Sequence, residues 1–229
     1  MARKLSDSIF AKIYLILYNV AQLIGWGAIL VEVIKHFSSG KINYAQLWAN
    51  SRLYLSIFQT LQLIEVVHAA IKLVPSSPVT TFVQIISRII VLWAILVPIK
   101  ETTASVGVAL ILASWSIAES TRYLYYALNI VSLVPSLLTW CRYSFFILLY
   151  PSGVSGELIL MWRALPYIKK RELLYYKLPN PLNISFYSDW VLMAIMFSYI
   201  PLFPQLYMYM LSQRRKVLGG TSKRKEKVK

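Results

Sequence analysis

The chain has 229 residues, of which 58% are hydrophobic and only 14% are charged. A soluble domain has about 25% charged residues, and a soluble chain of this size could not bury so much apolar surface in one core. The net charge is +15, but the sequence has one cysteine, two histidines and no glycine-rich phosphate loop. These features exclude a disulfide framework, a zinc site and a recognisable nucleotide-binding fold. The composition therefore predicts an all-α integral membrane protein.

Apolar stretches long enough to cross a bilayer recur along the chain, since a membrane helix needs about 20 such residues. The first stretch is too long for a cleavable signal peptide and lacks a small-residue cleavage site, so we expect it to remain as a membrane helix. The sequence predicts a six-transmembrane-helix bundle within residues 1–212, followed by a basic tail at 213–229. The predicted spans are about 13–34, 53–74, 79–99, 104–131, 136–165 and 187–211.

The basic tail sets the expected orientation. An even number of spans places both termini on one side of the membrane, and from Arg214 to Lys229 the tail is rich in lysine and arginine, with Glu226 as its one acidic residue. Positive segments beside membrane helices favour the cytosol and contact anionic lipid. We therefore expect both termini to be cytosolic. A nucleic-acid partner is disfavoured because the tail directly follows an apolar helix.

Several ionisable residues fall inside the predicted spans, where charge is costly and usually marks an ion pair or a functional site. Glu119 and Arg122 are three residues apart and can pair on one helix face. Arg88, in the preceding span, can link neighbouring helices. The simplest interpretation of these three residues is structural, because buried pairs commonly hold such bundles together. Glu65 and His68 in the second span are also interpreted as a helix contact.

The fifth span carries a second polar set. Tyr143, Tyr150 and Glu157 are spaced two helical turns apart, so an unbroken helix would place them on one stripe. Pro151 removes a backbone hydrogen bond and predicts a kink after Tyr150. Gly153 permits close approach of a ligand or another backbone. A carboxylate without a basic partner beside such a kink suits a general base, although the spacing alone leaves catalysis and structure both open.

The segment from Arg142 to Glu157, R-Y-S-F-F-I-L-L-Y-P-S-G-V-S-G-E, closely resembles the very-long-chain 3-hydroxyacyl-CoA dehydratases, also called the protein tyrosine phosphatase-like A family. Ser152 and Gly156 stand where threonine and serine or alanine are usual in that family, and neither position carries a catalytic group. The resemblance covers nearly the whole chain in order. Further matching stretches are L-Y-N at 17–19, G-W at 25–26, Q-I-I-S-R at 84–88, W-S-I-A-E at 115–119, R-Y at 122–123 and L-S-Q-R-R-K at 211–216.

The resemblance implies a membrane protein of the endoplasmic reticulum that catalyses the third step of fatty-acid elongation, in which 3-hydroxyacyl-CoA loses water to give trans-2-enoyl-CoA. It assigns the catalytic pair to Tyr150 and Glu157, with no cofactor and no metal. We expect Glu157 to be the base and Tyr150 the proton donor, although the sequence leaves the reverse assignment open. Residues expected to support the site are Arg88, Glu119, Arg122, Tyr123, Arg142, Tyr143 and Gly153.

The implied partners are a long-chain 3-hydroxyacyl-CoA substrate, membrane lipid, and the condensing enzyme, 3-ketoacyl-CoA reductase and enoyl-CoA reductase of the elongation cycle. A phosphatase is excluded because Trp140 and Ile147 stand where a catalytic loop around Cys141 would need histidine and arginine. A non-catalytic scaffold or regulator of the elongation enzymes stays open as the alternative, although intact Tyr150 and Glu157 weigh against it. A small transporter is weakened by the lack of an inverted repeat.

Overall fold

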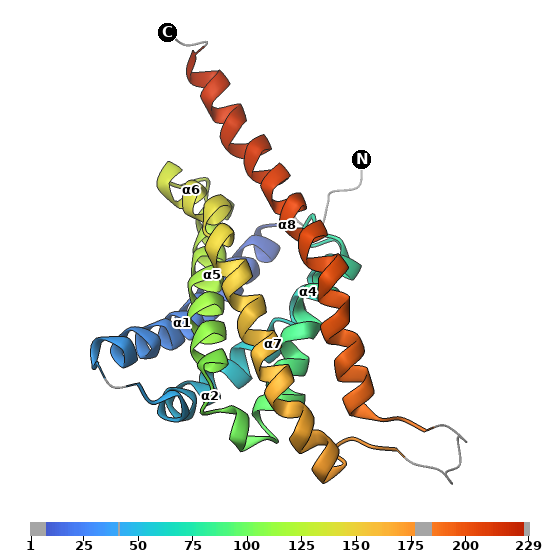
Figure 1. Cartoon of the computed structure of the whole chain (residues 1–229). Helices are drawn as coiled ribbons and strands as arrows, with labels where there is room; N and C mark the ends of the chain where they lie inside the picture. The colour runs from blue at the N-terminus through green and yellow to red at the C-terminus, as the bar shows by residue number, and fades with distance from the viewer. Residues whose placement is uncertain (1–7, 41, 177–184, 227–229) are drawn as a thin grey trace.

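The computed structural model describes residues 8–40, 42–176 and 185–226, with side chains described up to residue 219. Within these ranges the chain is helical, apart from connections and one isolated antiparallel bridge between Tyr176 and Phe186. Figure 1 shows the helices gathered into one bundle. In chain order they are α1 (Ile9–Ser38), α2 (Tyr44–Leu61), α3 (Ile64–Ala70), α4 (Pro78–Ile90), the π-helix η2 (Val91–Leu96), the 3-10 turn η3 (Lys100–Thr102), α5 (Val106–Ile130), α6 (Ser136–Ser144), α7 (Phe146–Arg171) and α8 (Ser188–Glu226).

Among the described residues, five helical stretches are long and apolar enough to cross a membrane, which supports the predicted membrane class but does not confirm the count of six. These stretches are Ile9–Ser38, Tyr44–Ala70, Pro78–Leu96, Ser136–Arg171 and Ser188–Gly219. The remaining long helix, α5, corresponds to the predicted fourth span. Its Glu119 and Arg122 lower its mean hydropathy, and Glu119 faces the interior of the bundle with an exposed fraction of 5%.

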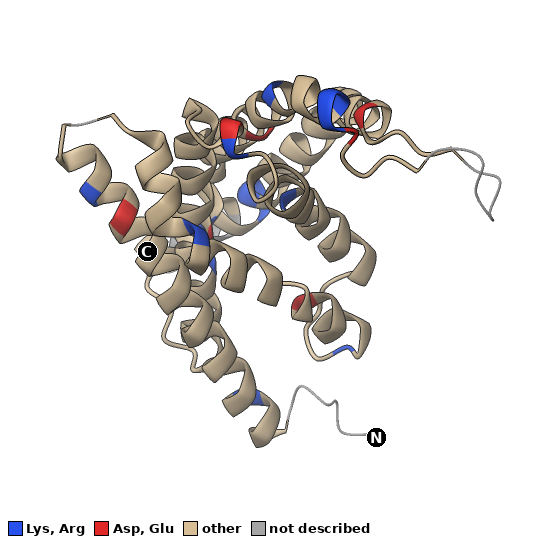
Figure 2. Cartoon of the chain, turned by 90° about the horizontal axis from the view of Figure 1, so that it is seen from below, with Lys and Arg blue, Asp and Glu red and all other residues tan. Residues whose placement is uncertain are grey.

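The outer surface of the bundle is apolar, as expected of a protein that contacts lipid. Phe10, Leu148 and Phe197 are exposed by 80%, 78% and 68%. Such a display of large apolar side chains over several helices is typical of a membrane-facing surface. Figure 2 shows charged residues at only a few positions along the helices.

Helix boundaries differ from the sequence prediction where a capping residue or an amphipathic segment decides them. α2 begins at Tyr44 rather than near residue 53, because the Asn43 side chain accepts a hydrogen bond of 3.0 Å from the Gln46 backbone N–H. The added turns bury Leu47 and Trp48. Gln46 and Asn50 face outward, so the mean hydropathy of this segment understated its helical character.

The predicted fifth helix is α6 followed by α7, and together they form one helical stretch, Ser136–Arg171. Phe145, between them, keeps right-handed helical backbone angles, φ −59° and ψ −31°, and α7 continues through Pro151 as α-helix. The Phe145 backbone N–H donates to the Cys141 carbonyl oxygen at 2.9 Å and the Leu149 N–H to the Phe145 carbonyl oxygen at 3.0 Å, so helical hydrogen bonding passes through this residue. At the other end of the chain, α8 passes the predicted domain boundary at 212 and continues to Glu226.

α5 occupies the centre of the bundle, with α1 and α7 packed against it. Glycines permit its closest contact with α7. A Cβ atom built on Gly156 would lie 2.8 Å from Ile111 Cγ2 and 3.0 Å from the carbonyl oxygen of Gly107. A Cβ atom on Gly107 would in turn lie 2.9 Å from the carbonyl oxygen of Gly156. This small-residue crossing brings the two helices close together and fixes the position of the neighbouring Glu157.

Candidate active site

The two residues predicted to be catalytic both lie on α7. Glu157 is buried, with an exposed fraction of 6%, and Tyr150 is half-buried. Seven residues of α-helix separate their backbones by about 10.5 Å along the axis, and the two side chains are within electrostatic range of each other. A small reacting group between them would therefore meet the Glu157 carboxylate on one side and the Tyr150 phenol on the other.

A second tyrosine, Tyr199 on α8, contacts Glu157 directly. Its hydroxyl donates a hydrogen bond of 2.5 Å to Glu157 Oε2. This hydrogen bond joins α8 to α7 at the carboxylate. The sequence analysis missed Tyr199, because nothing in an apolar stretch rich in tyrosine distinguishes this hydroxyl from its neighbours. The indole of Trp115 on α5 is another polar neighbour of Glu157.

Tyr150 is held by aromatic rings of α8. Its ring stacks on Phe203, with centroids 5.0 Å apart and planes 8° from parallel. Tyr207 extends the stack at 6.4 Å from Tyr150. Among the residues that the structure describes, the Tyr150 hydroxyl has no hydrogen-bond partner, so the stack fixes the ring and leaves the phenol proton available.

A buried ion network lies beside this pair, and its core is the predicted pair Glu119–Arg122. Glu119 accepts hydrogen bonds from Arg88 Nη1 at 2.5 Å, from Arg122 Nε at 2.7 Å and from Gln62 Nε2 at 3.0 Å. Removing one member of such a buried network leaves an uncompensated charge, which is strongly destabilising. Arg88 also lies within electrostatic range of Glu157 and stacks over the Trp115 ring at 5.2 Å. The network therefore borders the candidate site.

Glu65 is the second carboxylate of this network. Arg122 donates to both of its oxygens, with distances of 2.6 Å and 2.9 Å, and Tyr123 donates to Oε1. The predicted helix contact at Glu65 is therefore a bidentate ion pair between α3 and α5. His68 bonds to the hydroxyl of Tyr14 at 2.8 Å.

The remaining predicted site residues lie further from Glu157. Arg142 Nη2 donates to the hydroxyl of Tyr126 at 3.1 Å, and Tyr143 meets the ring of Tyr125 edge to face at 6.1 Å. Tyr143 contacts α5 through Tyr125, whereas Tyr150 contacts α8 through Phe203. That Tyr143 shares a stripe with Tyr150 and Glu157 stays a prediction.

Gly153 lies where α7 passes α5, as predicted, but it is not the tightest contact. A Cβ atom there would lie 3.5 Å from Ser114 Cβ and 3.6 Å from Trp115 Nε1, which is ordinary contact. The Ser114 hydroxyl also donates to Ser152 Oγ at 3.0 Å. The close approach that we expected at Gly153 is found one turn later, at Gly156.

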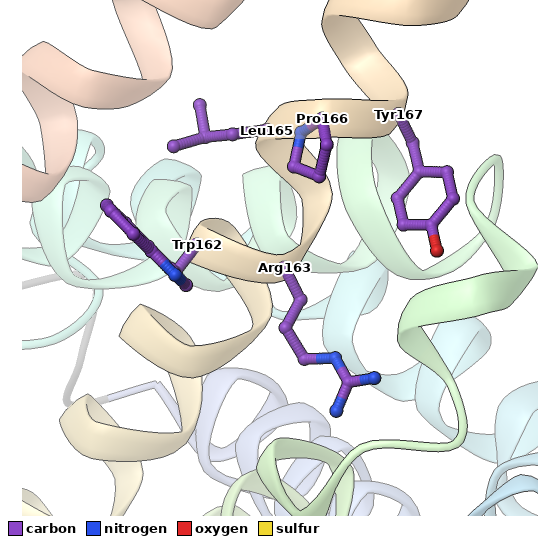
Figure 3. A pocket seen from close by; sticks show the side chains of 5 residues that line it. All are labelled: Trp162, Arg163, Leu165, Pro166 and Tyr167. Atoms are coloured by element: carbon purple, nitrogen blue, oxygen red, sulfur yellow. The ribbon is translucent and has the colours of Figure 1, made fainter.

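A groove of about 450 Å³ lies on α7 beyond the candidate site. Figure 3 shows the side chains that line it, and neither Tyr150 nor Glu157 is among them. Among the described residues, no cluster of three or more histidine, cysteine, aspartate or glutamate side chains forms that could hold a metal ion. The lining residues are Trp162, Arg163, Leu165, Pro166 and Tyr167.

Comparison of the sequence with known proteins identifies a family. The family model described as protein tyrosine phosphatase-like protein, PTPLA, matches residues 59–220. The chain is 42% identical to the very-long-chain (3R)-3-hydroxyacyl-CoA dehydratase hpo-8 of Caenorhabditis elegans, over 93% of this chain and 98% of that protein.

Two further relatives come from other kingdoms or phyla. The very-long-chain (3R)-3-hydroxyacyl-CoA dehydratase 2 of Homo sapiens is 41% identical over 94% of this chain and 85% of its own length. The dehydratase PASTICCINO 2 of Arabidopsis thaliana is 34% identical over 94% of this chain and 97% of its own length. No solved structure matches the chain.

Proposed function

Since the chain belongs to the protein tyrosine phosphatase-like protein family, PTPLA, we propose that it is a very-long-chain (3R)-3-hydroxyacyl-CoA dehydratase. The observation that carries this proposal is the similarity to dehydratases at 34% to 42% identity over more than nine-tenths of the chain. The activity is that of a hydro-lyase. It removes water across C2 and C3 of the acyl chain and leaves trans-2-enoyl-CoA.

In the mechanism that we propose, Glu157 takes the C2 proton and Tyr150 protonates the departing C3 hydroxyl. Glu157 accepts a hydrogen bond from Tyr199. This supports the assignment of Glu157 as the base, because an ionised carboxylate accepts hydrogen bonds and does not donate them. As the C2–H bond breaks, its electrons form the C2–C3 double bond while the C3–O bond breaks. The hydroxyl leaves as water with the proton of Tyr150. Return of the proton from Glu157 to Tyr150 resets the pair.

The neighbouring residues support this pair in different ways. Tyr199 and the Trp115 indole orient the carboxylate, and the stack on Phe203 orients the phenol. Burial excludes water that would compete with the substrate for Glu157. The network of Arg88, Glu119, Arg122, Tyr123 and Glu65 holds α3, α4 and α5 in register beside the site. These residues position the reacting groups rather than react themselves.

We further propose that α5 is a sixth membrane span. In Figure 1, α5 runs the length of the bundle from η3 to α6, α7 returns, and α8 runs back again. The polar side chains of α5 that would oppose membrane insertion face the interior, including the buried Ser116 and Glu119. Six spans place both termini on one side of the membrane, the side that carries the basic tail. We assign it to the cytosolic side of the endoplasmic reticulum membrane.

The chemistry of the substrate and product defines the proposed partners. A 3-hydroxyacyl-CoA arises by reduction of a 3-ketoacyl-CoA, which a condensing enzyme makes, and the enoyl product is consumed by an enoyl-CoA reductase. We propose that the protein works beside these three enzymes in very-long-chain fatty-acid elongation.

The test of the proposed function is a dehydration assay on the full chain purified in detergent, with a very-long-chain (3R)-3-hydroxyacyl-CoA as substrate. We expect the trans-2-enoyl-CoA product to form without any added cofactor. A folded protein that bound the substrate but released no enoyl product would contradict the proposal. That result would favour a scaffold for the elongation enzymes instead.

A further inference from the structure

One end of the bundle carries two arginines that form no salt bridge with the described residues, Arg142 and Arg214. There α6 packs against the C-terminal half of α8 (Figure 1). Arg214 Nε of α8 donates to the buried Ser144 hydroxyl of α6 at 3.1 Å, and Arg142 of the same α6 donates to the Tyr126 hydroxyl at 3.1 Å. Each guanidinium thus uses a neutral oxygen and retains further donors.

The other partly buried arginines behave differently. Arg88 and Arg122 bond to carboxylates, whereas neither Arg142 nor Arg214 takes part in a salt bridge within the described ranges. Arg142 Nε is also buried without a hydrogen-bond partner in this part of the chain. A buried cationic donor without an acceptor is costly. The arrangement therefore has the chemistry of an anion site.

The printed sequence explains why no carboxylate fills this role. It has no aspartate or glutamate between Glu119 and Glu157, and none between Asp189 and Glu226. The part of α5 after Glu119, all of α6, the start of α7 and most of α8 thus have no acidic side chain. The exposed Arg215 and Lys216 add positive charge at the same end.

The position of this arginine pair relative to the candidate active site identifies the anion. Ser144 precedes Glu157 by thirteen residues, or about 20 Å of helix, and Tyr150 lies between them. A thioester held between Tyr150 and Glu157 would extend its pantetheine arm along this distance. The arm ends in the pyrophosphate and 3′-phosphate of coenzyme A, and the planar guanidinium group of arginine matches phosphate oxygens in two-point contacts.

We propose that Arg142 and Arg214 bind the phosphates of the coenzyme A portion of the substrate at the end of the bundle where α6 packs against both α5 and α8. The inference rests on the proposed dehydratase function. It divides the substrate between two parts of the protein. This end of the bundle binds the charged head group, and the Tyr150–Glu157 pair meets the first carbons of the acyl chain.

The test compares two substrates with the same 3-hydroxyacyl chain, one a coenzyme A thioester and the other a pantetheine thioester without phosphates. We expect Arg142→Gln and Arg214→Gln each to raise KM for the coenzyme A thioester roughly tenfold, the effect of one lost hydrogen bond to a charged group. The kcat should stay within about twofold of wild type. Turnover of the pantetheine thioester should not change. Arg163→Gln, at an exposed arginine on α7, is the matched control and should leave KM for both substrates unchanged.

Three outcomes separate this inference from the function on which it rests. Equal losses with both thioesters would show that the arginines only hold α6 against α8, and unchanged KM would show that they contact no phosphate. Either result overturns the inference while dehydration continues. Failure of the wild type on both substrates would instead contradict the proposed function. If Arg142→Gln does not fold, as judged by thermal unfolding, Arg214→Gln decides the matter, and Arg214→Lys should recover part of the affinity by retaining the charge.

Discussion

Replacing Tyr199 by phenylalanine removes one hydroxyl group and leaves the ring that packs between α7 and α8. That hydroxyl is the donor 2.5 Å from Glu157 Oε2, and the carboxylate is buried. A hydrogen bond to a charged group contributes about 1.5–3 kcal/mol, and each 1.36 kcal/mol changes a rate about tenfold. We therefore expect Tyr199→Phe to lower kcat by roughly tenfold to a hundredfold, because Glu157 loses the group that orients it.

The same assay separates an orienting role from a structural one. Loss of orientation lowers kcat with little change in KM, whereas a misfolded variant loses active protein and thermal stability together. Tyr209→Phe, at an exposed tyrosine on the same helix, is the matched control and should keep wild-type turnover. In a Glu157→Gln background, Tyr199→Phe should cause little additional loss, because the two residues act as a unit. Wild-type kcat in the single Tyr199→Phe variant would refute this reasoning.

Three further predictions address the supporting structure. Gly156→Val should destabilise the protein by about 1–3 kcal/mol through overpacking against α5, whereas Gly27→Ala, with no neighbour within 4 Å, should be neutral in the same thermal unfolding measurement. Glu119→Ala should cost about 3–5 kcal/mol, because Arg88 and Arg122 lose their shared carboxylate; a thermal midpoint equal to that of wild type would argue against a buried network. The pKa of Glu101 is lowered by its own backbone N–H and by the hydrogen bond from Arg171. The ion pair between Glu101 and Arg171 should therefore stabilise η3 at pH values above the ordinary pKa of glutamate, and this stabilisation should be lost as the pH falls below that value. The measurement is the protection of residues 100–102 from hydrogen exchange as a function of pH. Glu101→Gln should abolish the pH dependence of this protection.

The sequence predicted the helices that are continuously apolar and missed boundaries set by local polar contacts. The start of α2 depends on Asn43 and on a segment that buries only one face. α5 was predicted because its apolar first half is long, although its polar second half keeps it below the hydropathy of the other spans. Pro151 lies inside α7, and the kink expected there stays a prediction.

The candidate site could be predicted only as far as local spacing allows. Glu119 and Arg122 are neighbours on one helix, so their pairing follows from the sequence. The Tyr199–Glu157 bond joins residues 42 positions apart, and the Arg122–Glu65 ion pair joins residues 57 apart. Both contacts depend on how the helices pack against one another, and the periodicity of a single helix carries no information about that packing. Helical spacing likewise could not show that Tyr143 meets Tyr125 of α5 whereas Tyr150 meets Phe203 of α8.

The central claim is that Glu157 and Tyr150 carry out the dehydration, and the most direct measurement is kcat of Glu157→Gln and Tyr150→Phe beside the wild type. Both changes nearly preserve shape and remove one reactive group each. With a very-long-chain (3R)-3-hydroxyacyl-CoA and folded, detergent-purified proteins, we predict turnover by the wild type and a loss of at least about a hundredfold in each variant, as expected of a lost general acid or base. Near-normal turnover in Glu157→Gln would contradict the account.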